Sequence, residues 1–527
     1  MRSSRSPLTF IAIGLLAALA GGVFGWRAAG HSTSGTGDTV RPADPVFPPA
    51  GREDLLAGAQ WLAAIEGKEE WRDHLSLSSG YHEFRIRIVF TVRQPPDGFL
   101  RLQSNCSLSE WTLNGRPIPQ PSEELRSEII AHVPASMLQA GRNVLEVPLA
   151  TYLDGPSEGP PAQALGLAAA LYRETDEDLA FDLGPILGCA GEDFFTVNCR
   201  TSIRAVVTLR VDGRDFADES GVFHSLKATG LKAGTRYEYS LTAALASGKI
   251  AVSSGPHPVK TLPGGDKLVF AAMGDNREGA EVWRHISRHV LGSGADFAVH
   301  SGDMTDSGQV SKWWSQQFWR PAAEFCASMP CFYVMGNHER SEAVFDMVFA
   351  TPSGTSNWQQ QVGPVLLVGI NSYKGDWSEG SANVKWLDGV LSGSKARFIF
   401  LIAHHPPYST VEGGGYKNMR GPFALLARYG GTAMICGHAH GYERSEPGVQ
   451  TSMIITAGAG APLYHGTPDD TINPYSKVLE SVYNYCLFTI DGDRCTMKAL
   501  SFGDDQSAKL GEPTVIDTRT WQAREVK

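Results

Sequence analysis

Five short apolar runs in the second half of the chain each end in a polar motif rich in Gly, Asp, Asn and His. The runs have the length and composition of buried β-strands. Strands of this kind leave their ends at one edge of a sheet, where residues far apart in the sequence can meet. The motifs are GDNR (274–277), GDMTD (302–306), GNHE (336–339), HHPP (404–407) and GHAH (437–440).

The side chains of these motifs carry the oxygen and nitrogen donors that divalent metal ions accept. One carboxylate can bridge two ions about 3.5–4 Å apart, as two-metal phosphate hydrolysis requires. A single GD pair or a single GNHE is more often a turn, but five such motifs in order favour a two-metal phosphoesterase site. The glycines that precede the donors are expected to permit tight turns there: Gly274, Gly302, Gly336 and Gly437.

These motifs, together with the runs GHAHGYER (437–444) and ITAGAGAPLY (455–464), resemble the calcineurin-like metallophosphoesterases. Within that family the resemblance is to the purple acid phosphatases, and it covers roughly residues 187–502. It implies two divalent or trivalent metal ions, which would be Fe, Mn or Zn.

The resemblance also implies a role for each motif. Asp303 would bridge the two ions, and His338 would protonate the leaving oxygen or stabilise charge there. In HHPP the family pattern favours His404 as the ligand over His405. The implied ligands are Asp275, Asp303 and His440 for the first ion, and Asp303, Asn337, His404 and His438 for the second.

Two positions depart from the family pattern. Arg277 stands where the general family has a His, and Asp306 stands where purple acid phosphatases have a Tyr. The first ion therefore lacks one protein ligand unless Asp306 or water replaces it, and nothing predicts a purple ferric centre. Arg277 is expected either to grip phosphate oxygens with its planar guanidinium or to pair with Glu278 or another carboxylate.

A chain of 527 residues implies three to four domains. We expect two β-sandwiches followed by an α/β domain, for which the resemblance implies a four-layer αββα sandwich. The predicted parts are a signal peptide or membrane anchor (1–30), a flexible linker (31–65), a jelly-roll β-sandwich (66–154), a linker (155–186), a fibronectin-III-like β-sandwich (187–262), the catalytic domain (263–505) and a tail (506–527).

The amino terminus predicts export. Arg2 and Arg5 precede an apolar stretch, residues 8–26, which contains the small-x-small cleavage signal Ala18-Leu19-Ala20. The stretch is close to the ~20 residues that span a bilayer, so a cleaved signal and a retained anchor both remain open. The domains would then be periplasmic, extracellular or anchored outside the cytoplasm. In that setting disulfides are expected, and the close pairs are Cys189 with Cys199, Cys326 with Cys331, and Cys486 with Cys495.

The composition and the first β-sandwich indicate which kinds of binding partner to expect. The net charge is −10 and no cluster of Lys and Arg occurs, so nucleic-acid binding is not expected. The first sandwich resembles modules that accompany glycoside hydrolases, which implies glycan or cell-envelope contact. Its Trp111 is either a sugar platform or, more often for such a residue, a buried strand side chain.

The sequence favours an exported phosphomonoesterase that uses a hydroxide held by two metal ions. One alternative is a phosphodiesterase or nucleotidase of the same fold. An alternative of another class is a non-catalytic glycan-binding or adhesion protein on a degenerate phosphoesterase scaffold.

Overall fold

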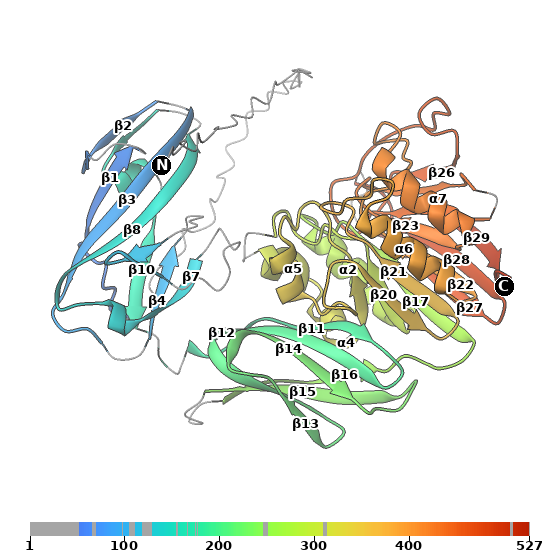
Figure 1. Cartoon of the computed structure of the whole chain (residues 1–527), viewed down its shortest axis with the longest axis horizontal. Helices are drawn as coiled ribbons and strands as arrows, with labels where there is room; N and C mark the ends of the chain where they lie inside the picture. Colours follow the sequence, from blue (N-terminus) through green and yellow to red (C-terminus); the bar gives the residue numbers. More distant parts are fainter. Residues whose placement is uncertain are drawn as a thin grey trace, which may run out of the picture. The chain divides into compact units, whose positions relative to one another are not determined.

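The computed structural model describes residues 52–525 with several gaps (Figure 1). The gaps are 66–69, 79, 97–98, 105–110, 119–128, 154–155, 166, 174, 176–177, 246–250, 309–312, 449 and 506–509. The predicted signal or anchor segment and Cys106 therefore lie outside the described residues. Within the described part of the chain, no helix is both long enough and apolar enough to cross a membrane.

The first domain is a β-sandwich, as the sequence predicts. Alternating residues of its strands point inward and form one apolar core, in which Trp111 is only 2% exposed, so Trp111 cannot serve as a sugar platform. One sheet has five strands in the order β1 (Gln60–Ile65), β3 (Gly80–Val92), β8 (Gly141–Leu153), β5 (Thr112–Leu113) and β6 (Arg116–Pro117). The other sheet has three strands in the order β10 (Ala169–Arg173), β4 (Phe99–Ser104) and β7 (Ile129–Pro134). Smaller elements are the pair β2 (Leu75–Leu77) and β9 (Ser157–Gly159), η1 (Ala135–Met137) and α1 (Pro161–Ala164).

The predicted boundaries of this sandwich are too narrow. Strand β1 begins at Gln60, inside the predicted linker 31–65, and β10 lies inside the predicted linker 155–186. Both strands are short, and the prolines and charges before β10 concealed it in the sequence. The second sandwich likewise begins before residue 187, because its first strand starts at Phe181.

The second domain is built around one long strand. Strand β12 (Phe194–Val211) pairs with four other strands of the domain along its length, which holds the fold together. Polar contacts join this domain to the next one: for example, Tyr239 Oη donates to the Ala327 carbonyl at 2.9 Å, and Lys260 Nζ lies 2.6 Å from Asp296 Oδ1. The other strands are β11 (Phe181–Ala190), β13 (Arg214–Ala217), β14 (Gly221–Thr229), β15 (Arg236–Ala244) and β16 (Ala251–Lys260).

The third domain has four layers, with two sheets inside and helices on both outer faces (Figure 1). The first sheet has the order β19 (Cys331–Tyr333), β18 (Phe297–His300), β17 (Lys267–Met273), β27 (Asn484–Asp491), β28 (Arg494–Ser501), β29 (Thr514–Gln522). The second has the order β20 (Trp358–Val362), β21 (Val365–Gly369), β22 (Phe398–Ile402), β23 (Ala433–Cys436), β25 (Ser452–Thr456), β24 (Tyr442–Ser445), β26 (Ser476–Glu480).

Helices cover each sheet on the side away from the other sheet. Those over the first sheet are α2 (Ala280–Gly292), η3 (Trp314–Trp319), α4 (Ala323–Ser328) and α5 (Glu342–Val348). Those over the second are α6 (Ala382–Gly393), η4 (Lys417–Met419) and α7 (Arg420–Arg428). Trp314 and Phe318 of η3 are buried in the helix–sheet core.

Aromatic rings fill the space between the two sheets. Phe270 of β17 lies 4.6 Å from Phe488 of β27 in a stacked pair and meets Phe400 of β22 edge-on at 5.1 Å, measured between ring centroids. Such pairs add to the stabilisation from burial. This packing fixes the first sheet against the second, and with it the strand ends that carry the polar motifs.

The prediction that residues 506–527 form a tail is wrong, because most of the described residues in this range belong to a strand. Residues 514–522 form β29, which pairs antiparallel with β28 at the edge of the first sheet. Asp517 of β29 accepts hydrogen bonds from Arg444 Nε at 2.6 Å and from Tyr442 Oη at 2.6 Å. Both donors belong to β24 of the second sheet, so β29 links the two sheets through an ion pair.

The three predicted disulfides are also wrong, because the seven described cysteines are free and buried. Strand register explains this for two of the pairs. In the hairpin of β27 and β28, Cys486 faces Ala499 and Cys495 faces Ile490. Between β11 and β12, Leu187 faces Val197 and Ala190 faces Phe195, so Cys189 lies beside Thr196 and not beside Cys199. Nearness in sequence had suggested bonds that the pairing of these strands does not permit.

We expect Arg444→Ala to destabilise the protein, because it leaves the buried Asp517 carboxylate without its cation. Removing one partner of a buried ion pair costs about 3–5 kcal/mol, and the 13% exposure of the Arg444 side chain places the loss toward the lower end. Thermal unfolding of the metal-free protein measures it. Arg494→Ala, at an exposed arginine of β28, is the matched control, and equal melting temperatures for both variants would contradict the prediction.

Candidate metal centre

The five motifs meet at the ends of strands from both sheets. Asp275, Asp303 and Asn337 follow β17, β18 and β19, which are parallel neighbours in the first sheet. His404 and His438 follow β22 and β23, which are parallel neighbours in the second. Because parallel strands end at the same edge, each sheet brings its own ligands together.

One cluster consists of Asp275, Asp303 and His440, all buried, with one potential ligand atom of each within 4.8 Å of the others. His440 Nε2 lies 3.6 Å from Asp275 Oδ1. Its other ring nitrogen, Nδ1, donates to the Pro462 carbonyl at 2.6 Å, which leaves a lone pair at Nε2 facing the carboxylates. Burial lowers the pKa of His440 to about 4, which favours the neutral ring that a metal ion needs.

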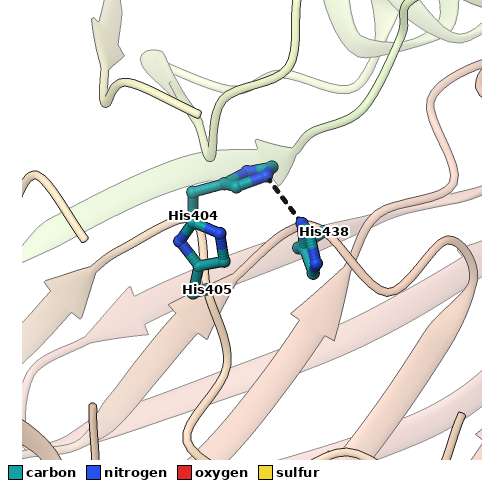
Figure 2. A group of neighbouring side chains, drawn as sticks. All are labelled: His404, His405 and His438. Carbon is teal, nitrogen blue, oxygen red and sulfur yellow. Dashed lines mark hydrogen bonds between the residues drawn. The ribbon is translucent and has the colours of Figure 1, made fainter. Parts of the chain in front are cut away.

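A second cluster contains His404 and His438 (Figure 2). The dashed line in Figure 2 joins His404 Nε2 to His438 Nδ1 at 3.2 Å. Asn337 Oδ1 lies 3.0 Å from each of these two nitrogens. His405 has a ligand atom within 4.8 Å as well, but its Nδ1 is 3.0 Å from Ser372 Oγ.

Asp303 connects the two clusters. Its Oδ1 lies 3.3 Å from His404 Nε2, and the same carboxylate is a member of the cluster with Asp275 and His440. A carboxylate shared in this way is what a bridging ligand between two ions requires. The structure thus brings all six predicted ligands into one site.

The donor set fits a cation on hydrogen-bonding grounds. His404 Nδ1 lies 2.9 Å from the Ser301 carbonyl, which can only accept, so Nδ1 carries the hydrogen. The Nε2 lone pair then faces the oxygens of Asn337 and Asp303, which are acceptors too. Either a cation or a proton must lie among them.

The pKa of His404 also indicates that a positive charge is favoured at this position. Burial alone lowers it, but the charges of Asp303, Asp275 and Glu339 outweigh burial and raise the pKa to about 9. For Asp303, burial opposes ionisation, and His404 and His338 reverse that effect and lower its pKa. In the metal-free protein a proton at His404 therefore occupies the position that a cation would take.

Three ligand positions have left-handed backbone: φ is 62° at Asp275, 55° at Asp303 and 71° at His438. This conformation is uncommon for residues other than glycine and is concentrated at functional sites. Of the four preceding glycines, only Gly302 has a positive φ. At Gly437, an added Cβ would lie 2.5 Å from Asp275 Oδ2, so close approach requires this glycine.

Glu339 is a positioning residue that the sequence reading missed. Its fully buried carboxylate accepts backbone hydrogen bonds from Asp303 at 3.0 Å, Met304 at 2.8 Å and Gly336 at 2.6 Å. It therefore ties the loop that carries Asp303 to the loop that carries Asn337. The signal was present in the last residue of the GNHE motif.

Arg277 and Asp306 form an ion network beside the first cluster. Arg277 is 12% exposed, contacts Glu278, and lies 3.6 Å from Asp303 and 3.5 Å from Asp306. Of the two predicted roles of Arg277, the ion pair with Glu278 is thus present in the structure. The Asp306 carboxylate is 46% exposed and faces Arg277 and His338; it is not a member of either ligand cluster.

Comparison with known proteins agrees with this geometry. Residues 268–442 match the profile of the calcineurin-like phosphoesterase family. This part of the chain is a calcineurin-like phosphoesterase domain. It is also related to acid phosphatases, because a stretch of 83 residues is 36% identical to tartrate-resistant acid phosphatase type 5 of Rattus norvegicus and, equally, of Mus musculus. That stretch is 15% of this chain and spans about a quarter of the relatives' length, 24%.

Solved structures show the same fold over a longer part of the chain. Purple acid phosphatase PPD1 from yellow lupin (Lupinus luteus) seeds superposes with a TM-score of 0.57 at 15% identity, over 88% of this chain and 96% of that chain. PhoD gives a TM-score of 0.54 at 12% identity, over 67% of this chain and 92% of its own. The likeness to the lupin enzyme agrees with β domains ahead of a mixed α/β domain.

The pKa of His404 predicts proton release when metal binds. Below about pH 9 the metal-free His404 ring is charged, whereas a metal ion binds only the neutral ring. Metal binding therefore displaces a proton, and the affinity for the metal rises with pH up to about pH 9. Calorimetric Zn²⁺ titration at about pH 7.5 in buffers of different ionisation enthalpy should show release of at least about one proton. A binding enthalpy that does not depend on the buffer would contradict this prediction.

Proposed function

We propose that this protein is an exported, metal-dependent phosphoesterase that hydrolyses phosphate monoesters with water. The observation that supports it most directly is the Asp303 carboxylate, which is a member of one ligand cluster and contacts His404 of the other, since this arrangement suits two-metal hydrolysis. Bound metal ions would supply Lewis acidity and a water of lowered pKa. Oxygen and imidazole donors of this kind accept Fe, Mn and Zn.

Arg277 is proposed to bind the phosphate. Its guanidinium lies beside Asp303, and its buried Nε has no acceptor within hydrogen-bonding distance. A substrate oxygen would satisfy that donor and replace part of the contact with Glu278 or Asp306. The planar guanidinium also suits the paired oxygens of a phosphate group.

His338 is proposed to protonate the departing alcohol. Its Nδ1 lies 2.6 Å from the Asp306 carbonyl and donates there, which fixes the ring. Nε2 then lies 3.9 Å from Asp303 Oδ2 on a side chain that is 19% exposed, so it faces the site and can be reached by substrate. A positioned imidazole of this kind contributes about 10²–10⁴-fold to rate.

The export proposal rests on the sequence of residues 1–30, in which two arginines precede an apolar stretch. A reporter that is active only outside the cytoplasm, fused after about residue 44, tests it. Activity of the fusion supports export. Activity that is lost when Arg2, Arg5 and the apolar stretch are deleted together identifies the segment responsible.

Metal-restored turnover tests the enzymatic proposal. The full chain, stripped with a chelator and reloaded with Mn, Fe or Zn, is expected to hydrolyse an aryl phosphate monoester faster than the matching diester. Asn337→Ala should lose this turnover because it removes an oxygen that lies 3.0 Å from both His404 and His438. Asn418→Ala, at an exposed asparagine, is the matched control.

The outcomes separate the candidate functions. Faster hydrolysis of the diester would favour the phosphodiesterase or nucleotidase alternative. Absence of turnover with every metal would contradict the enzymatic proposal and make glycan binding by the first β-sandwich the function to test next.

For His338→Ala we expect a loss that depends on the leaving group. Turnover of an alkyl phosphate should fall about 10²–10⁴-fold, and turnover of a nitrophenyl phosphate much less, because a good leaving group needs no proton. Metal content should not change. His74→Ala, at an exposed histidine of the first domain, is the control. An equal loss for both substrates would remove the acid role from His338.

A further inference from the structure

Tyr416 makes a close polar contact with a residue of the second ligand cluster. Its phenol oxygen lies 2.7 Å from His438 Nε2. Its ring centroid lies 5.0 Å from that of His438, at an interplanar angle of 84°, and 4.3 Å from that of His405. Tyr416 therefore holds the side of the His438 ring that faces away from Asn337.

The two ring nitrogens of His438 have different surroundings. Nδ1 faces Asn337 Oδ1 at 3.0 Å and His404 Nε2 at 3.2 Å, where a cation would lie. To bind a cation at Nδ1, the neutral ring must carry its hydrogen on Nε2, and that hydrogen needs an acceptor. The Tyr416 oxygen is at the right distance, whereas Glu412 Oε2, at 3.9 Å, is too far for a hydrogen bond.

The segment that carries Tyr416 needs an anchor. It includes Gly413, Gly414 and Gly415, with φ of 58°, 95° and 76°, and consecutive glycines lose more conformational entropy on ordering than other residues. Tyr416 N donates to the Pro406 carbonyl at 2.8 Å at one end of the segment. A second attachment fixes the other end.

That second attachment is Glu443, a buried residue of β24 that lies three positions after His440. Its carboxylate accepts from Thr410 N at 2.9 Å and from Thr410 Oγ1 at 2.6 Å. It also accepts from Asn473 Nδ2 at 2.8 Å. Glu443 thus ties residues 409–416 to the strand that directly follows the GHAH motif.

We infer that Tyr416 is a positioning residue that fixes the tautomer and orientation of His438 for metal binding, and that Glu443 holds the segment in place for this purpose. The inference rests on the metal-binding role of His438 within the proposed function. Hydrogen-bond partners behind a metal ligand typically contribute 10–100-fold to metal affinity. Here that contribution should fall on the ion bound by His438.

Tyr416→Phe keeps the ring contacts and removes only the oxygen. Zn²⁺ is titrated into the full metal-free chain in competition with a chromophoric chelator, which resolves two equivalents by affinity. One equivalent should weaken about 10–100-fold, while the other equivalent and the melting temperature of the metal-free protein stay unchanged. Tyr408→Phe is the control, because Tyr408 precedes the same segment and packs against Phe423 and Tyr475.

Glu443→Gln provides a second test, because the amide keeps the size of the side chain but loses charge and one acceptor. It should weaken the same equivalent as Tyr416→Phe. Wild-type affinities in Tyr416→Phe, or equal weakening of both equivalents, would overturn the inference. Asn337→Ala distinguishes failure of this inference from failure of the proposed function. If the wild-type protein binds two equivalents of Zn²⁺ and Asn337→Ala loses one, the metal centre is supported whatever Tyr416→Phe shows. If the wild-type protein binds no Zn²⁺, the proposed function itself is contradicted.

Discussion

The site depends on one carboxylate at the meeting point of two sheets. Asp303 leaves the first sheet after β18, and its Oδ1 reaches His404, which leaves the second sheet after β22. That contact is useful only if the sheets keep a fixed separation, which the aromatic packing around Phe270 provides. It also needs a fixed loop, which Glu339 provides through three backbone hydrogen bonds. The chemistry of the site is therefore a consequence of how the whole domain packs.

Much of this could be read from the sequence, because strand patterns and ligand-type residues are local signals. The apolar runs before Asp275, Asp303 and His438 predicted both the strands and the convergence of their ends. What the sequence could not provide was register. Cys486 and Cys495 lie close in the chain, yet the hairpin places them opposite Ala499 and Ile490. Pairing across a sheet is set by non-local packing, so nearness in sequence did not predict it.

Other omissions have the same physical origin. Strand β29 resembles a tail in sequence because six of its nine residues are polar or charged, and only the Asp517 pairing with Arg444 shows why it is ordered. The glycines before the ligands were expected to permit tight turns, and only Gly302 does so with a positive φ. At Gly274, Gly336 and Gly437 they supply space instead, and Asp275 and His438 adopt the left-handed backbone themselves. Such a division of roles depends on neighbours that only the folded chain brings together.

The bond between Arg444 and Asp517 spans 73 positions of the chain. During synthesis, Asp517 therefore emerges several seconds after Arg444, because ribosomes add about 5–20 residues per second. Until Asp517 emerges, the edge of the first sheet at β28 has unpaired backbone groups, which other chains can recognise. In the interval before β29 docks, this edge is thus exposed to aggregation and accessible to a chaperone.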